Sequence, residues 1–93
     1  MLDMKTWTFL TNHAYVLLLI AEDQTIRLRD VATKAGITER AAQRIVADLA
    51  DGGYLTRKRV GRRNVYTVHR RQKLRHELGA SRDIGSLLDV LMD

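Results

Sequence analysis

The chain has 93 residues, of which 45% are hydrophobic and 29% charged, and its formal net charge is +5. This length sets an upper bound of one small domain, and the composition is that of an ordinary globular chain, not of a disordered tail. Cysteine is absent, which excludes disulfides, thiolate metal sites and a cysteine nucleophile, and which fits a cytoplasmic protein. The longest nearly apolar run, 14–21, is too short to cross a bilayer, so we expect no membrane partner.

Apolar residues at helical spacing predict three helices in the first half of the chain, over about 12–22, 29–35 and 39–51. Thr11 and Thr38 are suited to cap the first and third helices, and Gly36 is suited to end the second. Residues 25–28 are expected to be extended. The inward stripe expected in the first helix is Ala14, Leu17, Leu18 and Ala21. Val16, Leu19 and Ile20 widen it, so most of this helix is expected to be buried.

Two strands are predicted next, over 54–60 and 64–69, joined around Gly61. Tyr66 is expected to face the core from the second strand. The chain is expected to form a single domain, 1–93, with its core at 12–69.

A last helix is expected to begin near Arg70 or Gln72, to break around 79–81 and to resume at Ile84. This segment, 70–93, is predicted to be a C-terminal helical dimerisation segment.

The positive charge is concentrated in residues 57–76, which hold nine Lys/Arg and no Asp or Glu, whereas residues 1–56 sum to −1 and residues 77–93 to −3. An excess confined to so short a stretch indicates a charged site, and a phosphate backbone is its natural partner. A structural explanation stands beside this one, because charged strand edges also prevent unwanted strand pairing.

The predicted helices at 29–35 and 39–51 are separated by the short turn 35–38, which would set them at a steep angle. The second helix of such a pair can enter a major groove while the first lies against the DNA backbone. Arginine binds guanine O6 and N7, and glutamine binds adenine N6 and N7, so Arg40, Gln43 and Arg44 suit base reading. The same residues would also suit a solvated helix face.

A basic hairpin directly after this helix pair resembles the winged helix-turn-helix of bacterial ArsR- and MarR-type regulators. The resemblance covers about residues 14–69 and is carried by Thr-Glu-Arg-Ala-Ala-Gln-Arg at 38–44, Gly-Tyr-Leu at 53–55 and Val-Gly-Arg-Arg-Asn-Val-Tyr-Thr-Val at 60–68. It implies an α+β fold, mainly α, with a wing sheet of two or three strands and a C-terminal helix. It also implies a homodimeric, sequence-specific regulator of transcription that binds double-stranded DNA, with the third helix in the major groove and the wing on the backbone or minor groove.

The resemblance and the side-chain chemistry together assign three groups of candidate DNA contacts. The recognition-helix candidates are Thr38, Glu39, Arg40, Gln43 and Arg44; the wing candidates are Arg57, Lys58, Arg59, Arg62, Arg63 and Asn64; and the backbone candidates are Arg27 and Arg29. The later cations, Arg70, Arg71, Lys73 and Arg75, have two explanations, as further phosphate contacts or as the polar start of the last helix.

Other classes of function have less support in the sequence. No paired carboxylates, phosphate-binding glycine loop or Ser/His/Asp pattern predicts an enzyme, and we expect no catalytic residue and no cofactor. No metal site is expected, since His13, His69 and His76 lack ligand spacing. A small-molecule effector, if there is one, would need a pocket between helices or across a dimer interface.

The alternative function is a winged-helix protein–protein module that docks an acidic partner, and RNA binding ranks third. The apolar arm Trp7, Phe9 and Leu10 is expected to pack in the core or in a dimer. The homodimer is expected to form through this arm, the first helix and the C-terminal helix.

Overall fold

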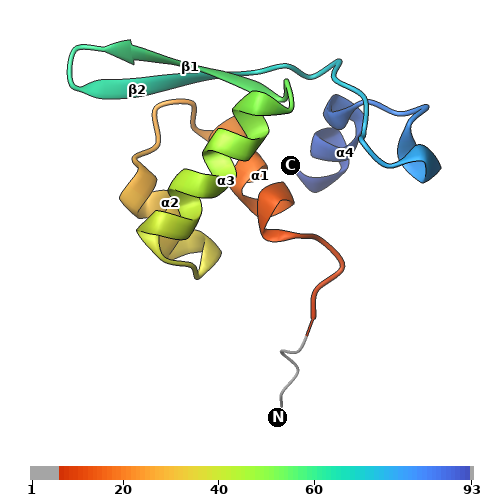
Figure 1. Ribbon diagram of the computed structural model, residues 1–93, viewed down its shortest axis with the longest axis horizontal. Coiled ribbons are helices and arrows are strands. Elements are labelled where there is room, and N and C mark those ends of the chain that lie inside the picture. The colour runs from red at the N-terminus through yellow and green to blue at the C-terminus, as the bar shows by residue number, and fades with distance from the viewer. Residues whose placement is uncertain (1–6, 93) are drawn as a thin grey trace.

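The computed structural model describes residues 7–92, so positions 1–6 and 93 of the predicted domain lie outside the described residues (Figure 1). The described chain is a small α+β domain of helices and one two-stranded antiparallel sheet, an arrangement compatible with a winged helix. Its elements are α1 (Asn12–Glu22), α2 (Leu28–Ala35), α3 (Glu39–Asp51), β1 (Leu55–Val60), β2 (Arg63–Val68), the 3-10 turn η2 (Glu77–Gly79) and α4 (Ile84–Leu91). The predicted fold class is confirmed.

The predicted helix ends are confirmed by hydrogen bonds at the caps. The amide of Ala14 donates to the hydroxyl of Thr11 at 3.2 Å, and the amide of Ala41 donates to the hydroxyl of Thr38 at 3.0 Å. Gly36 ends α2 with φ 71° and ψ 35°, a left-handed conformation that favours glycine. This turn sets the steep angle between α2 and α3 that is visible in Figure 1.

Helix α1 lies at the centre of the core, where it contacts α2, α3, β2 and α4. Because it is packed on several sides, its buried residues are Val16, Leu17 and Ile20. The predicted inward positions are therefore confirmed at Val16, Leu17 and Ile20, and the remaining ones, Ala14, Leu18, Leu19 and Ala21, are half-buried. The rest of the core comes from α2, α3, the hairpin, α4 and the loops before α2 and β1. It consists of Ile26, Val31, Ala32, Ala42, Ile45, Val46, Leu49, Tyr54, Leu55, Tyr66, Ile84 and Leu88.

The hairpin pairs Leu55 with Val68 at its base and Val60 with Arg63 at its tip. Tyr66 is 2% exposed, which confirms its predicted core position. The extended segment before α2 does not add a third strand. It contributes one main-chain bond, from the amide of Tyr66 to the carbonyl of Gln24 at 2.9 Å, and this bond ties the hairpin to the α1–α2 loop. In Figure 1 the hairpin extends past that loop, away from α4.

The prediction of a helix beginning near Arg70 or Gln72 is wrong. The main chain of this segment pairs across a loop instead, from Leu74 N to Arg82 O at 3.0 Å and from Ile84 N to Gln72 O at 2.8 Å. These groups are consequently not available for helical hydrogen bonds. Helix α4 does begin at Ile84, where the sequence predicts that helical spacing resumes. We call residues 70–92 the C-terminal lobe.

Close backbone contact holds this lobe together. The amide of Gly85 donates to the carbonyl of Arg70 at 2.7 Å, and a Cβ on Gly85 would lie 2.8 Å from that same oxygen. Only glycine therefore fits this position without a shift of the backbone. The lobe thus depends on a contact between two residues that are far apart in the sequence.

Candidate nucleic-acid interface

The recognition face of α3, defined as Thr38, Glu39, Arg40, Gln43 and Arg44, is exposed at every position. It points outward because the opposite side of α3 carries Ala42, Ile45, Val46 and Leu49, all buried in the core. Arg40, Gln43 and Arg44 line one hollow with Thr38, whose hydroxyl also caps the helix. Glu39 is exposed but does not line that hollow. The predicted set is thus brought together apart from Glu39.

Two polar residues of this hollow, His13 and Asp48, are not among the predicted site residues. Asp48 lies on the stripe of Arg40 and Arg44, one turn beyond Arg44, and His13 comes from the start of α1. The i, i+4 spacing of Asp48 is readable in the sequence. The approach of His13, 35 residues away in the chain, is not.

The six wing candidates do not share one face of the hairpin. Side chains alternate between the two faces of a strand, so Arg57 and Arg59 lie on the same side as the buried Leu55, and Lys58 lies on the other side. The register places Asn64 opposite Arg59 and Arg63 opposite Val60. Arg62 occupies the turn next to Gly61, whose φ is 60°. The wing therefore offers cations on both faces and at its tip.

The tip of the wing and the first part of β2 meet the start of α2 in a second hollow, which we call the wing-tip hollow. Arg27, Arg62, Arg63 and Asn64 supply its polar side chains. The guanidinium of Arg63 donates to the carbonyl of Thr25 at 2.5 Å, and this bond holds it at the rim. Arg29, the other backbone candidate, is exposed on the first turn of α2 but does not line the hollow.

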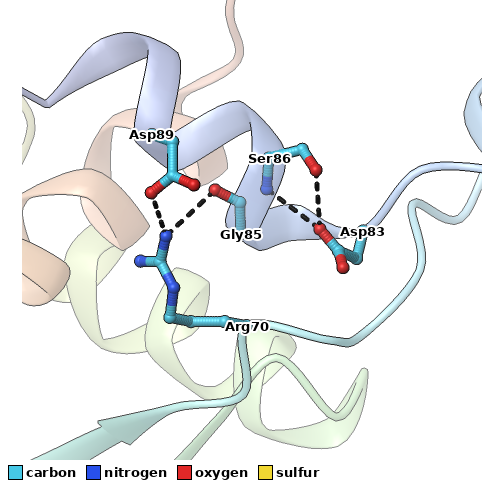
Figure 2. Close-up of polar contacts among 5 residues, drawn as sticks. All are labelled: Arg70, Asp83, Gly85, Ser86 and Asp89. Atoms are coloured by element: carbon cyan, nitrogen blue, oxygen red, sulfur yellow. Dashed lines mark hydrogen bonds and ion pairs between the residues drawn. The ribbon is translucent and has the colours of Figure 1, made fainter.

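The cations that follow the wing differ from the wing cations in the contacts that they make. Arg70 donates to the carbonyl of Gly85 at 3.1 Å and pairs with the carboxylate of Asp89 (Figure 2). Lys73 Nζ lies 3.5 Å from the carbonyl of Ser81. The structure therefore gives Arg70 and Lys73 roles within the C-terminal lobe, while Arg71 is exposed and Arg75 lines a separate apolar groove.

Asp83 is the N-cap of α4, as Figure 2 shows. Its carboxylate accepts hydrogen bonds from the amide and from the hydroxyl of Ser86, both at 2.9 Å. The main-chain bond is the chief reason that the pKa of Asp83 lies below its ordinary value, and the bond from the Ser86 hydroxyl adds to the effect. The nearby cations Lys73 and Arg70 act in the same direction.

Each of the three histidines makes a separate hydrogen bond. His13 Nε2 lies 2.9 Å from Asp48 Oδ2, His69 Nε2 lies 2.5 Å from the hydroxyl of Thr56, and His76 Nδ1 accepts from the amide of Leu78 at 3.1 Å. Within residues 7–92, no group of three or more His, Asp or Glu side chains is placed to hold a metal ion. Over the same residues, no helix is long and apolar enough to cross a membrane.

Comparison with known proteins returned no match to a family model and no match to a curated protein. Functional inference therefore rests on the chemistry of the exposed surface. That surface presents guanidinium and amide donors on one helix face and a second set of cations on the neighbouring hairpin and the start of α2.

Proposed function

We propose that this chain is a cytoplasmic, sequence-specific regulator of transcription that binds double-stranded DNA as a homodimer of the winged helix-turn-helix kind. The observation that carries the proposal is the pairing of two exposed polar sites on elements that are tied to each other. One is the recognition face of α3 and the other is the wing-tip hollow. The bond from Tyr66 to Gln24 ties the hairpin to the loop that leads into the helix pair.

In the proposed complex α3 enters the major groove. Arg40 and Arg44 are one turn apart on an exposed face, and Gln43 lies beside them. Guanidinium groups can bind guanine O6 and N7 in pairs of hydrogen bonds, while the glutamine amide matches adenine N6 and N7. These three side chains supply the sequence preference.

The wing and the start of α2 supply the sequence-independent affinity. Arg27, Arg62 and Arg63 line the wing-tip hollow, where one backbone phosphate can face several guanidinium groups. Each phosphate that a cation neutralises releases condensed counterions, so affinity falls as salt concentration rises. In a symmetric homodimer the two recognition helices read half-sites about 34 Å apart, which is one turn of the duplex.

A selection of bound fragments from a random pool of duplexes tests the proposal. The expected outcome is enrichment of an approximately palindromic site with half-sites about one helical turn apart. A mobility shift with generic duplex DNA at low salt is the simpler companion measurement. Absence of any retardation would contradict DNA binding and would favour the module that docks an acidic protein partner. Stronger retardation of single-stranded or duplex RNA would favour the RNA-binding alternative.

A further inference from the structure

An apolar groove opens on the side of the domain where the N-terminal arm leaves α1. The arm is residues 7–11, and the groove runs between it, the end of α3 and the C-terminal lobe. Its apolar lining is Leu10, Ala14, Leu17, Leu49, Leu74 and Leu87, together with Phe9, Tyr54 and Ile84. No part of the proposed DNA-binding surface other than His13 and Asp48 touches it.

The arm does not fill this groove in its own chain. Phe9 stands at the groove and is nevertheless 91% exposed, and Trp7 is 68% exposed. The two rings contact each other edge to face, with centroids 5.0 Å apart and an interplanar angle of 81°. The prediction that these aromatics pack in the core is therefore wrong for the single chain, and packing against another chain is the part of that prediction that stays open.

The groove carries both signs of charge, from different elements. Asp51 comes from the last turn of α3, whereas Arg75 comes from the C-terminal lobe. Two copies related by a twofold axis make an isologous contact, in which the same surface of both copies is used and the two surfaces run in opposite directions. Such an axis can bring the acidic side of one groove to the basic side of the other. The rim is thus self-complementary in charge.

The two arms offer a substantial apolar area to a partner chain. A buried aromatic side chain removes about 150–250 Å² from water, so two arms with two rings each remove about 600–1,000 Å². The surfaces of the two grooves that the rings cover add to this area and bring the contact toward the size of a standard specific interface, which is about 1,200–2,000 Å².

We infer that the groove of each chain binds the arm of a second copy. The homodimer then forms by reciprocal exchange of Trp7 and Phe9 between two chains. This inference rests on the homodimer in the proposed function and names its contact. The exchange explains why a bent apolar arm projects from the domain (Figure 1) beside a groove that it does not occupy. It also leaves the recognition face of each copy free.

Cysteine cross-linking tests the exchange directly, because the chain has no native cysteine. One full-length chain carries Phe9→Cys and a second carries Leu87→Cys, and the two are mixed and oxidised. Reciprocal exchange predicts a cross-linked heterodimer from the mixture. It also predicts that a chain carrying both substitutions forms covalent dimers. Covalent closure only within single chains would show that the arm folds back on its own groove, and would overturn the inference.

Sedimentation of the unmodified chain and of two variants gives an independent measurement. The double variant Trp7→Ser/Phe9→Ser should raise the dimer dissociation constant by about 100-fold or more, since buried aromatic anchors dominate interface energies. Val60→Ser, at an exposed apolar position on the wing, is the matched control and should leave the dimer intact. A monomeric unmodified chain, or a double variant that dimerises as well as the control, would contradict the exchange.

The DNA measurements separate this inference from the proposed function. A monomeric Trp7→Ser/Phe9→Ser chain should still retard duplex DNA at low salt, with affinity lowered for a two-half-site duplex and unchanged for a single half-site. If this variant retards DNA and still dimerises, the arm exchange is contradicted and DNA binding is supported. If the unmodified chain does not retard duplex DNA, the proposed function is contradicted instead.

Discussion

His13 and Asp48 meet beside the recognition face, where Nε2 of the imidazole lies 2.9 Å from Oδ2 of the carboxylate. Asp48 continues the stripe of Arg40 and Arg44 along α3, so it places a negative charge where the proposed complex has phosphates. His13 gives that carboxylate a hydrogen-bond partner from outside α3. Both side chains are about half exposed, at 46% and 53%. The pair therefore influences the charge of the face more than the stability of the fold.

Asp48→Asn is expected to tighten binding to every duplex, because it removes a negative charge from the DNA-facing side of α3. A surface charge interaction of about 1 kcal/mol corresponds to about fivefold in affinity at low salt, and the gain should fade as salt is added. Titration of a scrambled duplex at several salt concentrations measures the effect. Glu77→Gln, an equal change of charge in the C-terminal lobe, is the control. Equal affinities for Asp48→Asn and Glu77→Gln would place Asp48 away from DNA.

Arg62→Ala/Arg63→Ala is expected to weaken binding to all sequences alike, because the wing contacts the backbone. The slope of log affinity against log salt should flatten by about one unit for each phosphate that the variant chain no longer neutralises. Arg82→Ala removes the same kind of charge from the C-terminal lobe and should leave the slope unchanged. A slope that does not change in the wing variant would argue against phosphate contacts by these residues.

Arg44→Ala is expected to reduce discrimination between the selected duplex and a scrambled one. Removal of a bidentate hydrogen-bonded pair to a base costs about 1–3 kcal/mol of that discrimination. The ratio of the two dissociation constants is the measurement, and it cancels any general change in charge. If both duplexes lose affinity equally, Arg44 contacts the backbone and not a base.

Arg70→Ala is expected to loosen the C-terminal lobe without affecting the DNA interface. Its guanidinium bridges Gly85 O and Asp89 in Figure 2, and removal of such a partly exposed interaction costs about 1 kcal/mol. Urea unfolding of Arg70→Ala, Asp89→Ala and the double variant measures the coupling between the two side chains. The salt dependence of DNA binding should match that of the unmodified chain. A flatter slope of log affinity against log salt in Arg70→Ala would show that Arg70 contacts a phosphate.

Acid should weaken α4 through Asp83. Its pKa is lowered in the folded chain, chiefly by the hydrogen bond from the amide of Ser86. The carboxylate therefore stabilises the fold above its ordinary pKa of about 3.9, and this contribution disappears as the pH falls through the lower folded value. Asp83→Asn keeps a side-chain oxygen that can cap the helix, but it has no carboxyl group to titrate.

The two chains should accordingly differ in stability at pH 6 and converge as the pH falls below about 4. Hydrogen exchange of the α4 amides, followed against pH, measures this convergence. A difference that stays constant down to the lowest pH would show that the charge of Asp83 does not contribute.

The sequence by itself determined the elements whose signals are local. Helix ends at Thr11, Gly36 and Thr38 follow from short-range caps, and the hairpin with its buried Tyr66 follows from strand alternation and a glycine turn. The exposure of Arg40, Gln43 and Arg44 follows in the same way, because a helix that buries one stripe must expose the other. Each of these features depends on residues within a few positions of one another.

Only the tertiary structure decided the features that depend on distant partners. The sequence predicts a helix from about residue 70 or 72 to a break at 79–81. This segment does not form that helix, because Gln72 and Leu74 pair with the main chain of Ile84 and Arg82, beyond the reach of a helical turn. Arg70 belongs to the basic stretch 57–76 in the sequence, but this loop places it in contact with Asp89. Periodic patterns encode which face of an element is apolar, whereas the choice of a remote hydrogen-bond partner depends on how the elements pack.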